Sequence, residues 1–566
     1  DTLVLQAGTP GSILSFSVAA PAAPALVATT SAALYGTVDV SSGSALAAGQ
    51  YNLVSFSTIS AGGLSDLTLR TTPSLQPGLV AALAQNSSTI YLDVKSGATT
   101  LYWNGATVTG TTIVGGTSTW SNSPTTNWMD TSLPLNTPTA WNPGDVAIFS
   151  ATPGGAQTAT VSGNIVVGGL QFDVNGYTVT GSTGDKLTLT PASGTSVTIA
   201  VNGLSNTTTL NVLLDGTADI DITGDSNLVL GNAGNSFVGD VTIDQVQVFI
   251  SDNGNLGNPA NSVTLNDGGI LVFDSMTSFS RTISLTGSGG EIATNVTAPD
   301  ITISSTISGS GALDVNSAGG AITLSGTNTY TGGTYLDEGT LAISSDANLG
   351  DSAGNILVYG GTLHVTDTMA TARDLGLLAA DLTIEVDGTK TFTISGTVSE
   401  TGGAGSLEKT GDGILVLSNT GNSYTGGTTI SAGQLSITSD GNLGDASGGV
   451  TLSGGTLAVS GTVSSARGFT VSGASNGIAL SAAADTLTLT GAISGAGDLT
   501  QSGNGTLVIA ADNSATFTDE DYKRSAAVAP QCSPPGSPGV LLTASPVVSR
   551  QHHAHWRFPK GGEEDK

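Results

Sequence analysis

Four aspartates gather in one short segment and are the residues best placed for catalysis. They are Asp215, Asp219, Asp221 and Asp225. Only one residue separates Asp219 from Asp221, so both side chains leave the same face if the segment is a strand. Paired carboxylates at a controlled separation can hydrolyse glycosidic bonds. The same cluster also fits a solvated outer face or a loose Ca²⁺ site. Asp219 and Asp221 are therefore the only catalytic candidates, and a solvated face is the interpretation we favour.

A glycosidase built on this pair needs two further features. One carboxyl group must keep its proton as the general acid, which requires burial or a crowded neighbouring carboxylate. Aromatic rings must also stack against the sugar, yet no Trp or Tyr lies between Tyr177 and Tyr330. The Phe residues of that interval are more typical of a core. We therefore expect no hydrolytic chemistry from this pair.

The histidines are few and poorly placed for catalysis. His552, His553 and His555 could bind a transition metal, since imidazole suits Zn, Ni or Cu, but they lie in a Pro-rich segment with no partner ligand. His364 stands alone in an expected strand, which favours a surface histidine. One histidine in residues 1–521 leaves a serine hydrolase almost no choice of base. No glycine-rich segment has the P-loop pattern before a helix. We predict no enzyme activity, no cofactor and no metal site.

The charge balance excludes several partners. The chain has 43 acidic and 14 basic residues, and its net charge is −29. Such a surface repels phosphate backbones, so we predict no nucleic-acid partner. The sequence also excludes a disulfide framework, because Cys532 is the only cysteine. No apolar run is long enough for a membrane-spanning helix. Because the chain starts at Asp1 without a basic leader segment, we expect no signal peptide and a mature or excised piece of something longer.

The elements that must carry these residues are short strands. Residues 486–490 read Thr-Leu-Thr-Leu-Thr, and similar alternating runs recur along the chain between Gly, Asn and Ser turns. Alternation with a period of two indicates strands with one buried face. The 79 glycines provide turns that need a positive φ. Nothing has a sustained helical period, so the sequence predicts an all-β chain.

Internal repeats organise these strands. The segment 330–334, Tyr-Thr-Gly-Gly-Thr, recurs at 424–428, and 348–351, Asn-Leu-Gly-Asp, recurs at 442–445. Both displacements are 94 residues, and a third copy lies about 93 residues upstream. We place the three copies at about 226–318, 319–411 and 412–504.

Stacking such strands into a coil buries them where isolated hairpins could not. The prediction is an all-β, right-handed parallel β-helix (β-solenoid) of roughly 20 or more rungs, each of about 20–25 residues. An array of β-sandwich domains is the alternative. The copies join without linkers, and no aromatic pair recurs in each copy as a sandwich core usually requires.

The repeated segment closely resembles the passenger-associated transport repeat of autotransporters. The resemblance rests on residues 324–334 with 338–341, and on 417–428 with 432–435, where Gln434 departs from the usual small polar residue. Trp103, Trp120, Trp128 and residues 143–149 stand in the order of the family's autotransporter-associated β-strand regions. The resemblance covers about residues 1–515.

The resemblance implies a domain order and a function. Residues 1–98 would end a preceding β-helical passenger module, 99–150 would start a Trp-containing module, and 151–521 would be the β-helix. It further implies a secreted or surface-displayed adhesin or rigid stalk, at the bacterial cell surface. Its partners would be glycans or proteins of a host or neighbouring cell, and an outer-membrane β-barrel translocator in the full-length protein. A β-helical carbohydrate-active enzyme and a purely structural spacer remain the alternatives.

Residues 522–566 depart from the family pattern. They contain six of the 19 prolines and the only cysteine, and they reverse the charge balance to six basic against three acidic residues. This composition resembles foreign sequence appended to a truncated passenger. We expect the segment to be disordered.

Overall fold

A computed structural model describes residues 207–510 without a break. Residues 99–203 are described with gaps at 106–111, 122–126, 132–136, 152–153, 175 and 193. Before residue 99 and after residue 510 it describes strands. Within residues 522–566 the structure describes only the strands β56 (Lys523–Arg524) and β57 (Val540–Thr543). The prediction of disorder for the rest of this segment lies outside the described residues, as do His552, His553, His555 and Cys532.

The chain divides into two compact units. The first comprises Asp1–Asp221 with Asn235–Val238, and the second comprises Ile222–Gly234 with Gly239–Lys566. The first seven strands form two small sheets in the orders β1-β3-β5 and β2-β4-β7-β6. Their bounds are β1 (Ile13–Val18), β2 (Val27–Ala28), β3 (Ala32–Ser42), β4 (Gly49–Phe56), β5 (Ile59–Thr71), β6 (Leu79–Gln85) and β7 (Thr89–Ser96). β7 pairs antiparallel with both β4 and β6. The assignment of 1–98 to a preceding module stays a prediction.

The rest of the first unit starts on an aromatic cluster. Trp103, Trp120, Trp128 and Phe149 are fully buried, and the rings of Trp103 and Trp128 meet edge to face with centroids 5.0 Å apart. Trp103 Nε1 donates to the Gly116 carbonyl at 2.7 Å. From there parallel strands stack as β8-β12-β15-β18, β9-β13-β16-β19 and β14-β17-β20. Their bounds are β8 (Thr100–Trp103), β9 (Ser118–Ser121), β12 (Val146–Phe149), β13 (Gln157–Ser162), β14 (Asn164–Val167), β15 (Gly169–Phe172), β16 (Tyr177–Gly181), β17 (Lys186–Leu189), β18 (Ser196–Val201), β19 (Thr207–Asn211) and β20 (Leu213–Gly216).

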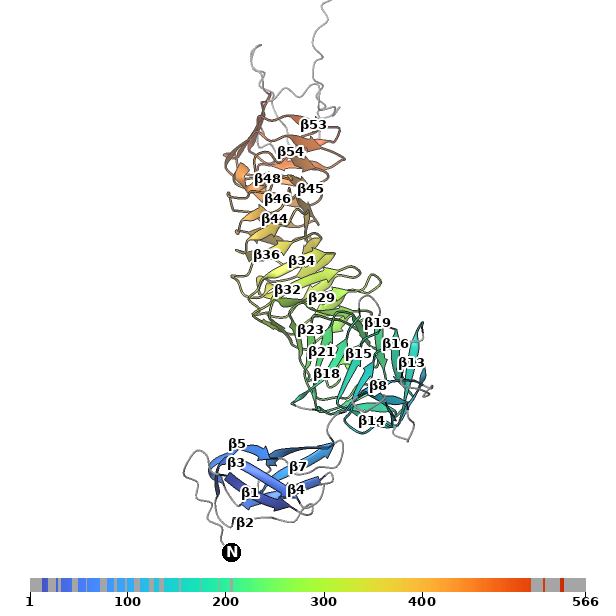
Figure 1. Cartoon of the computed structure of the whole chain (residues 1–566). Coiled ribbons are helices and arrows are strands. Elements are labelled where there is room, and N and C mark those ends of the chain that lie inside the picture. The colour runs from blue at the N-terminus through green and yellow to red at the C-terminus, as the bar shows by residue number, and fades with distance from the viewer. Residues whose placement is uncertain are drawn as a thin grey trace, which may run out of the picture. The chain divides into compact units, whose positions relative to one another are not determined.

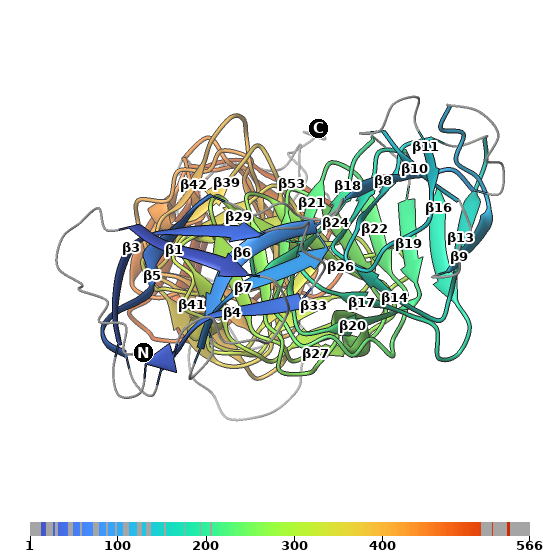
Figure 2. The ribbon, with the colours of Figure 1, turned by 60° about the horizontal axis from the view of Figure 1, so that its bottom comes forward.

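The second unit is a parallel β-solenoid (Figure 1). In the tilted view of Figure 2, successive turns of the coil lie over one another. Two columns of paired strands carry the side chains discussed below. Column 1 contains β22 (Asn227–Leu230), β24 (Gln247–Ile250), β26 (Gly269–Phe273), β29 (Gly289–Thr294), β32 (Ala312–Ser317), β34 (Thr334–Glu338), β36 (Ile356–Val358), β39 (Leu375–Leu377) and β42 (Val398–Glu400). Column 2 contains β27 (Ser278–Phe279), β30 (Ile301–Ile303), β33 (Ile322–Leu324), β35 (Thr340–Ile343), β37 (Thr362–Val365), β40 (Leu382–Val386), β43 (Leu407–Thr410), β45 (Thr428–Ile430), β47 (Val450–Leu452), β50 (Phe469–Val471) and β53 (Ile493–Gly495).

Three further columns complete the coil. One contains β23 (Val241–Asp244), β25 (Val263–Asn266), β28 (Ile283–Thr286) and β31 (Ile307–Gly309). Another contains β38 (Met369–Thr371), β41 (Thr391–Ile394), β44 (Ile414–Leu417), β46 (Gln434–Ile437), β48 (Thr456–Val459), β51 (Asn476–Ala479) and β54 (Leu499–Ser502). The last contains β49 (Thr462–Ser465), β52 (Thr486–Leu489) and β55 (Thr506–Ile509).

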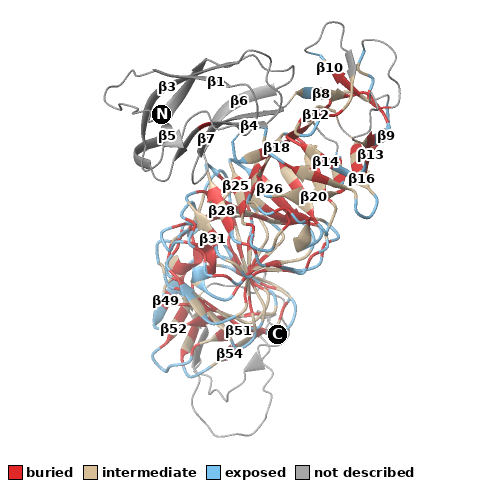
Figure 3. Ribbon diagram, turned by 90° about the horizontal axis from the view of Figure 1, so that it is seen from below, coloured by how far each residue is buried: buried red, intermediate tan, exposed pale blue. Residues whose placement is uncertain are grey.

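The alternating sequence produces the core directly. In β40, for example, Leu382, Ile384 and Val386 are buried while Thr383 and Glu385 are half-buried. Figure 3 shows the same alternation of buried and more exposed residues along the strands of the coil. Helix in the described residues is confined to the short 3₁₀ turns η1 (Asn253–Leu256), η2 (Asp346–Leu349) and η3 (Asp440–Leu443). The prediction of an all-β parallel solenoid is confirmed.

The number of turns is lower than the roughly 20 predicted, at about 16. The prediction spread rungs over the whole of residues 1–521. The described coil begins only near Thr100, because β1–β7 pair among themselves in their own sheets.

Buried polar side chains replace strand pairing where the repeated motif turns a corner. Asn328 accepts a hydrogen bond from the Ile307 amide at 2.8 Å and donates to the Asn348 carbonyl at 2.5 Å. Tyr330 is fully buried, and its hydroxyl lies 2.7 Å from Thr334 Oγ1. Asn422 and the Tyr424–Thr428 pair repeat this arrangement one copy later. The spacing that the two repeat copies share thus reflects backbone groups that no neighbouring strand satisfies.

A buried arginine closes each 3₁₀ turn in the same way. The Arg373 guanidinium donates to the carbonyls of Gly350 and Gly354, at 2.8 and 2.9 Å, and its Nε lies 2.9 Å from Asp346 Oδ1. Arg467 makes the equivalent contacts with Gly444 and Gly448, and its Nε lies 3.0 Å from Asp440. The charge is buried but paired, and it satisfies the carbonyls at the end of each turn.

The earliest of these arginine sites lacks its carboxylate. Arg281 donates to the carbonyls of Asn253 and Gly257 at 2.7 and 2.8 Å, but the position equivalent to Asp346 is Asn253. Arg281 Nε and Asn253 Oδ1 are both buried without a hydrogen-bond partner. Burial lowers the pKa of Arg281 from its ordinary value.

Restoring this carboxylate should stabilise the solenoid. We expect Asn253→Asp to raise the free energy of unfolding by about 1 kcal/mol, because a charge-assisted hydrogen bond to Arg281 would satisfy two buried groups, at the loss of only the exposed hydrogen bond from Asn253 Nδ2 to the Ser278 carbonyl. Urea unfolding, with amide hydrogen exchange at Asn253–Leu256, measures the effect. Asn164→Asp, at an exposed position of β14, controls for the added charge. An equal gain in both variants would contradict the explanation.

Candidate functional site

The catalytic candidates lie at the start of β21 (Asp219–Gly224), in the part of this strand that belongs to the first unit. Ile220 and Ile222 are buried, while Asp219 and Asp221 are half-buried and share the opposite face, as the alternation predicts. Asp221 accepts a hydrogen bond from Ser196 Oγ on the neighbouring β18.

Asp215, another member of the aspartate cluster, is paired with neighbouring side chains. The carboxylate of Asp215 lies 2.5 Å from Lys186 Nζ and accepts from Ser236 Oγ at 3.1 Å. The hydrogen bond from Lys186 is the main reason that the pKa of Asp215 lies below its ordinary value. A general acid needs the opposite shift. The proximity of four aspartates in sequence therefore does not create a crowded acidic pair at Asp215.

Crowded carboxylates occur instead in column 1 of the second unit. Glu291 on β29 is the direct cross-strand partner of Asp314 on β32, and Asp314 is the partner of Tyr335 on β34. Asp337 follows two residues after Tyr335, so it shares the same outward face. Three acidic side chains therefore stand on three consecutive strands; we call Glu291, Asp314 and Asp337 the acidic ladder.

The acidic ladder holds its protons more tightly than ordinary carboxyl groups. Burial, followed by the charges of Asp337 and Asp314, raises the pKa of Glu291 to about 7. Burial and the charge of Asp337 raise the pKa of Asp314 to about 6. The pKa of Asp337 is also raised, chiefly by burial and then by Glu338. Like charges on adjacent strands destabilise one another. No nearby cation contributes to the pKa of any of the three carboxyl groups.

Two tyrosines and two members of the acidic ladder, Asp314 and Asp337, line a hollow. The rings of Tyr335 and Tyr359 are nearly parallel, with an interplanar angle of 21° and centroids 6.5 Å apart. Tyr359 is 55% exposed, which is unusual for so large a ring. The hollow has a volume of about 530 Å³, and its lining consists of Ser288, Ala312, Asp314, Tyr335, Asp337 and Tyr359. We call it the tyrosine hollow; none of its six lining residues is basic.

The sequence analysis did not predict the tyrosine hollow, although the spacing of its acidic residues and tyrosines indicates it. Glu291, Asp314 and Asp337 are spaced by 23 residues, and Tyr335 and Tyr359 by 24. Strand partners in this part of the coil lie 21 to 23 residues apart, as in Asp314 with Tyr335 and Glu291 with Asp314, so residues at about this interval come close together. A search for close pairs such as Asp219 and Asp221 overlooks residues that are neighbours only in the fold.

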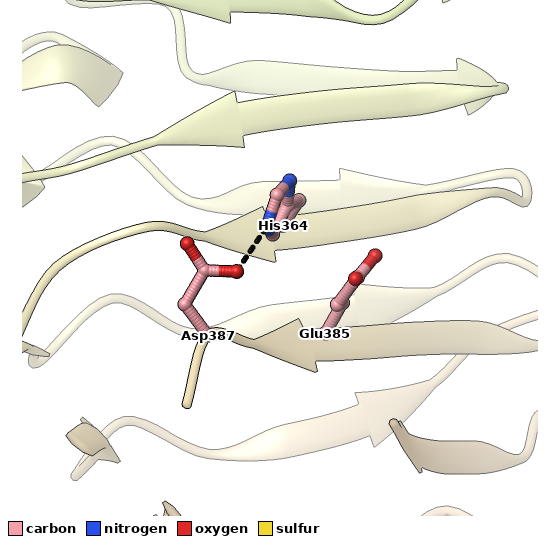
Figure 4. Close-up of side chains that lie close together, drawn as sticks. All are labelled: His364, Glu385 and Asp387. Atoms are coloured by element: carbon pink, nitrogen blue, oxygen red, sulfur yellow. Dashed lines mark hydrogen bonds and ion pairs between the residues drawn. The ribbon is translucent and has the colours of Figure 1, made fainter. Parts of the chain in front are cut away.

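A second cluster surrounds the histidine that the sequence left as a lone surface residue. His364 on β37 is the cross-strand partner of Glu385 on β40, and Asp387 follows directly after β40. His364 Nε2 lies 2.9 Å from Asp387 Oδ1. One ligand atom from each of the three side chains lies within 4.8 Å of the others. Figure 4 shows the three side chains together on the outer side of the two strands.

Comparison with known proteins identifies the repeats. A family model described as the passenger-associated transport repeat matches residues 319–343, 407–437 and 499–518. The chain is also 30% identical, over 315 residues, to a protein of Brucella suis biovar 1 (strain 1330) named "Adhesin BmaC autotransporter". That match covers 50% of this chain and 9% of the relative, so the chain spans only a small part of the relative's length. No solved structure matches. Among the described residues, no helix is long and apolar enough to span a membrane.

The raised pKa values predict how stability depends on pH. The folded acidic ladder binds protons more tightly than the unfolded chain, so stability falls as the pH rises from the ordinary carboxyl range to about 7. Glu291→Gln should remove much of this loss: we expect a gain on the order of 1 kcal/mol at pH 8, after solvent screening, and little change at pH 4. Urea midpoints across this range test it. Glu408→Gln, on β43, is the control, and an equal pH response in both variants would refute the assignment.

Proposed function

We propose that the chain is a passenger segment of an autotransporter and that it acts as a surface adhesin whose solenoid displays the tyrosine hollow; the match to passenger-associated transport repeats and the similarity to an autotransporter adhesin support this. A passenger segment of this kind would lie at the cell surface, associated with the outer membrane. The observation that carries the proposal is the tyrosine hollow itself. The exposed ring of Tyr359, next to the half-buried Tyr335 and partly buried carboxylates, is costly to maintain and has no evident part in folding.

The chemistry of the tyrosine hollow suits a ligand that carries an ammonium group. Such a cation can lie against the faces of Tyr335 and Tyr359, which attract positive charge. It can at the same time pair with Asp314 and Asp337, whose charges otherwise repel one another. A neutral sugar could stack on the rings but would leave that repulsion in place. Amino sugars and lysine side chains offer this group on the glycans or proteins of a host or neighbouring cell.

The solenoid itself suits display at a distance from the membrane. Each turn pairs with the turns on either side, so the hollow rests on ordered strands. In the full-length protein, we propose that an outer-membrane translocator anchors the chain. A purely structural spacer is the remaining non-enzymatic alternative, and it predicts that no ligand binds.

The adhesin proposal predicts selective binding of amines. Surface plasmon resonance at physiological salt should show that chitosan oligosaccharides bind the full chain, whereas the fully acetylated oligomers of the same length do not. The third repeat copy has Thr429, Ser431 and Ser453 at the positions of Tyr335, Asp337 and Tyr359. The combined variant Tyr335→Thr, Asp337→Ser and Tyr359→Ser should therefore fold and should bind at least about tenfold more weakly, a loss of about 1.4 kcal/mol.

The control for this experiment must account for the negative charge of the whole chain. Asp412→Asn removes one exposed carboxylate far along the sequence, the same charge change as in the triple variant. It should leave the affinity unchanged. Equal weakening in both variants, or no binding by the unaltered chain, would overturn the tyrosine hollow as the recognition site; the second result would favour the spacer.

A glycoside hydrolase is the second candidate, and the acidic ladder is the observation in its favour. Glu291 has the raised pKa that a general acid requires, and its cross-strand partner Asp314 lines the hollow that contains the two tyrosine rings. However, the carboxyl groups stand in one row on one face of consecutive strands. Hydrolysis needs two carboxyl groups that flank the scissile bond. We therefore propose binding without catalysis.

A panel of neutral and amino polysaccharides should accordingly show no turnover above a heat-treated sample. If turnover appears, Glu291→Gln and the pair Asp219→Ala with Asp221→Ala identify its source. Loss of turnover in either variant, with unchanged circular dichroism, would replace the adhesin proposal by the enzyme.

A further inference from the structure

The cluster of His364, Glu385 and Asp387 has the composition of a metal site rather than of an ordinary ion pair. An ion pair accounts for His364 and Asp387, whose Nε2 and Oδ1 atoms are 2.9 Å apart. It leaves Glu385 unexplained. The Glu385 carboxylate accepts no hydrogen bond from any described residue, although it lies directly across from the imidazole.

The nearest buried cation does not neutralise Glu385 by direct contact. Lys409 is fully buried, and its Nζ donates to the carbonyls of Thr410 and Gly411 at 2.5 and 2.8 Å. Its ammonium group is therefore already committed to backbone carbonyls. The carboxylate of Glu385 stays available to an ion from the solvent side.

The strands hold the three side chains in a fixed relation. Leu363 and Val365 on β37, and Ile384 and Val386 on β40, are buried on the opposite face and anchor the two strands in the core. Asp387 directly follows the last residue of β40, and its amide donates to the Val365 carbonyl at 3.0 Å, which continues the pairing of the two strands. Paired strands position ligands more reliably than loops do.

We propose that His364, Glu385 and Asp387 bind a divalent transition-metal ion, with Zn²⁺ as the representative ion. Imidazole with two carboxylates is a donor set that Zn²⁺ and its neighbours accept, at about 2.0–2.2 Å from each ligand atom. Ligand atoms that lie within 4.8 Å of one another can reach such an ion with small rotations of the side chains. The side chains of His364 and Asp387 are 24% and 45% exposed, so water can complete the coordination.

The chain itself provides substitutions that should preserve the fold. The third repeat copy has Ala458, Ala479 and Ser481 at the positions of His364, Glu385 and Asp387. The same kind of strand therefore forms without any of the three ligands. His364→Ala, Glu385→Ala and Asp387→Ser are the matched variants.

The test is a Zn²⁺ titration by isothermal calorimetry on the full chain. His552, His553 and His555 must first be replaced by alanine, because these histidines could bind the ion themselves. We expect one ion per chain in this background, and each matched variant should lose more than about tenfold in affinity. Co²⁺ in place of Zn²⁺ should give a visible absorption spectrum that His364→Ala abolishes.

Two results would overturn the proposal. One is the absence of a stoichiometric site in the chain that retains His364. The other is an affinity that stays the same when Glu385 is replaced, because a histidine–aspartate pair alone would then explain the cluster. Circular dichroism of each variant separates loss of ligand from loss of fold.

Discussion

The fold depends on one constraint: the backbone groups of each strand are satisfied only by strands one turn away. Thr334 pairs with Ile356 and Leu363 with Ile384, so partners lie 22 and 21 residues apart. A strand that lost this register would leave several buried amides and carbonyls without hydrogen-bond partners. The resulting loss of folding free energy would exceed the contribution of most single side-chain contacts. The same register stacks like side chains in rows along the coil. Leucines and isoleucines in such rows form the core, and acidic residues in such rows repel one another.

Side chains take over this role where strand pairing stops. At the corners of the repeated motif, Asn328 and Asn422 supply the hydrogen bonds that a neighbouring strand would otherwise supply. Arg373 and Arg467 do the same for the carbonyls of the 3₁₀ turns. Buried polar groups of this kind are stable only when every partner is present. The buried polar residues that recur in the repeat copies are therefore, in physical terms, substitutes for missing strand hydrogen bonds.

The sequence predicted the strands, the repeats and the coil because these depend on local alternation and on similarity at a fixed interval. It placed Asp219 and Asp221 on one face for the same reason. It could not pair Glu291 with Asp314, or His364 with Glu385, because loop lengths vary from turn to turn. A change of one residue in a loop sends a side chain to the other face of its strand. The predicted number of turns was too high for a related reason, because periodicity in the sequence does not show that β1–β7 pair among themselves.

The repeat copies separate the scaffold from its chemistry. β34 and β45 are equivalent in sequence, yet they lie in different sheets of the second unit, so successive copies present the same strand on different faces. At the exposed positions of these strands, Tyr335 and Asp337 in one copy are Thr429 and Ser431 in the next. The inward residues keep their character, with Leu336 matched by Ile430. Since a parallel ladder constrains only backbone spacing and the buried face, the outward face is free to change residue by residue. A coil with a constant core can thus carry the tyrosine hollow on one turn and the His364 cluster on the next, without any change in how it folds.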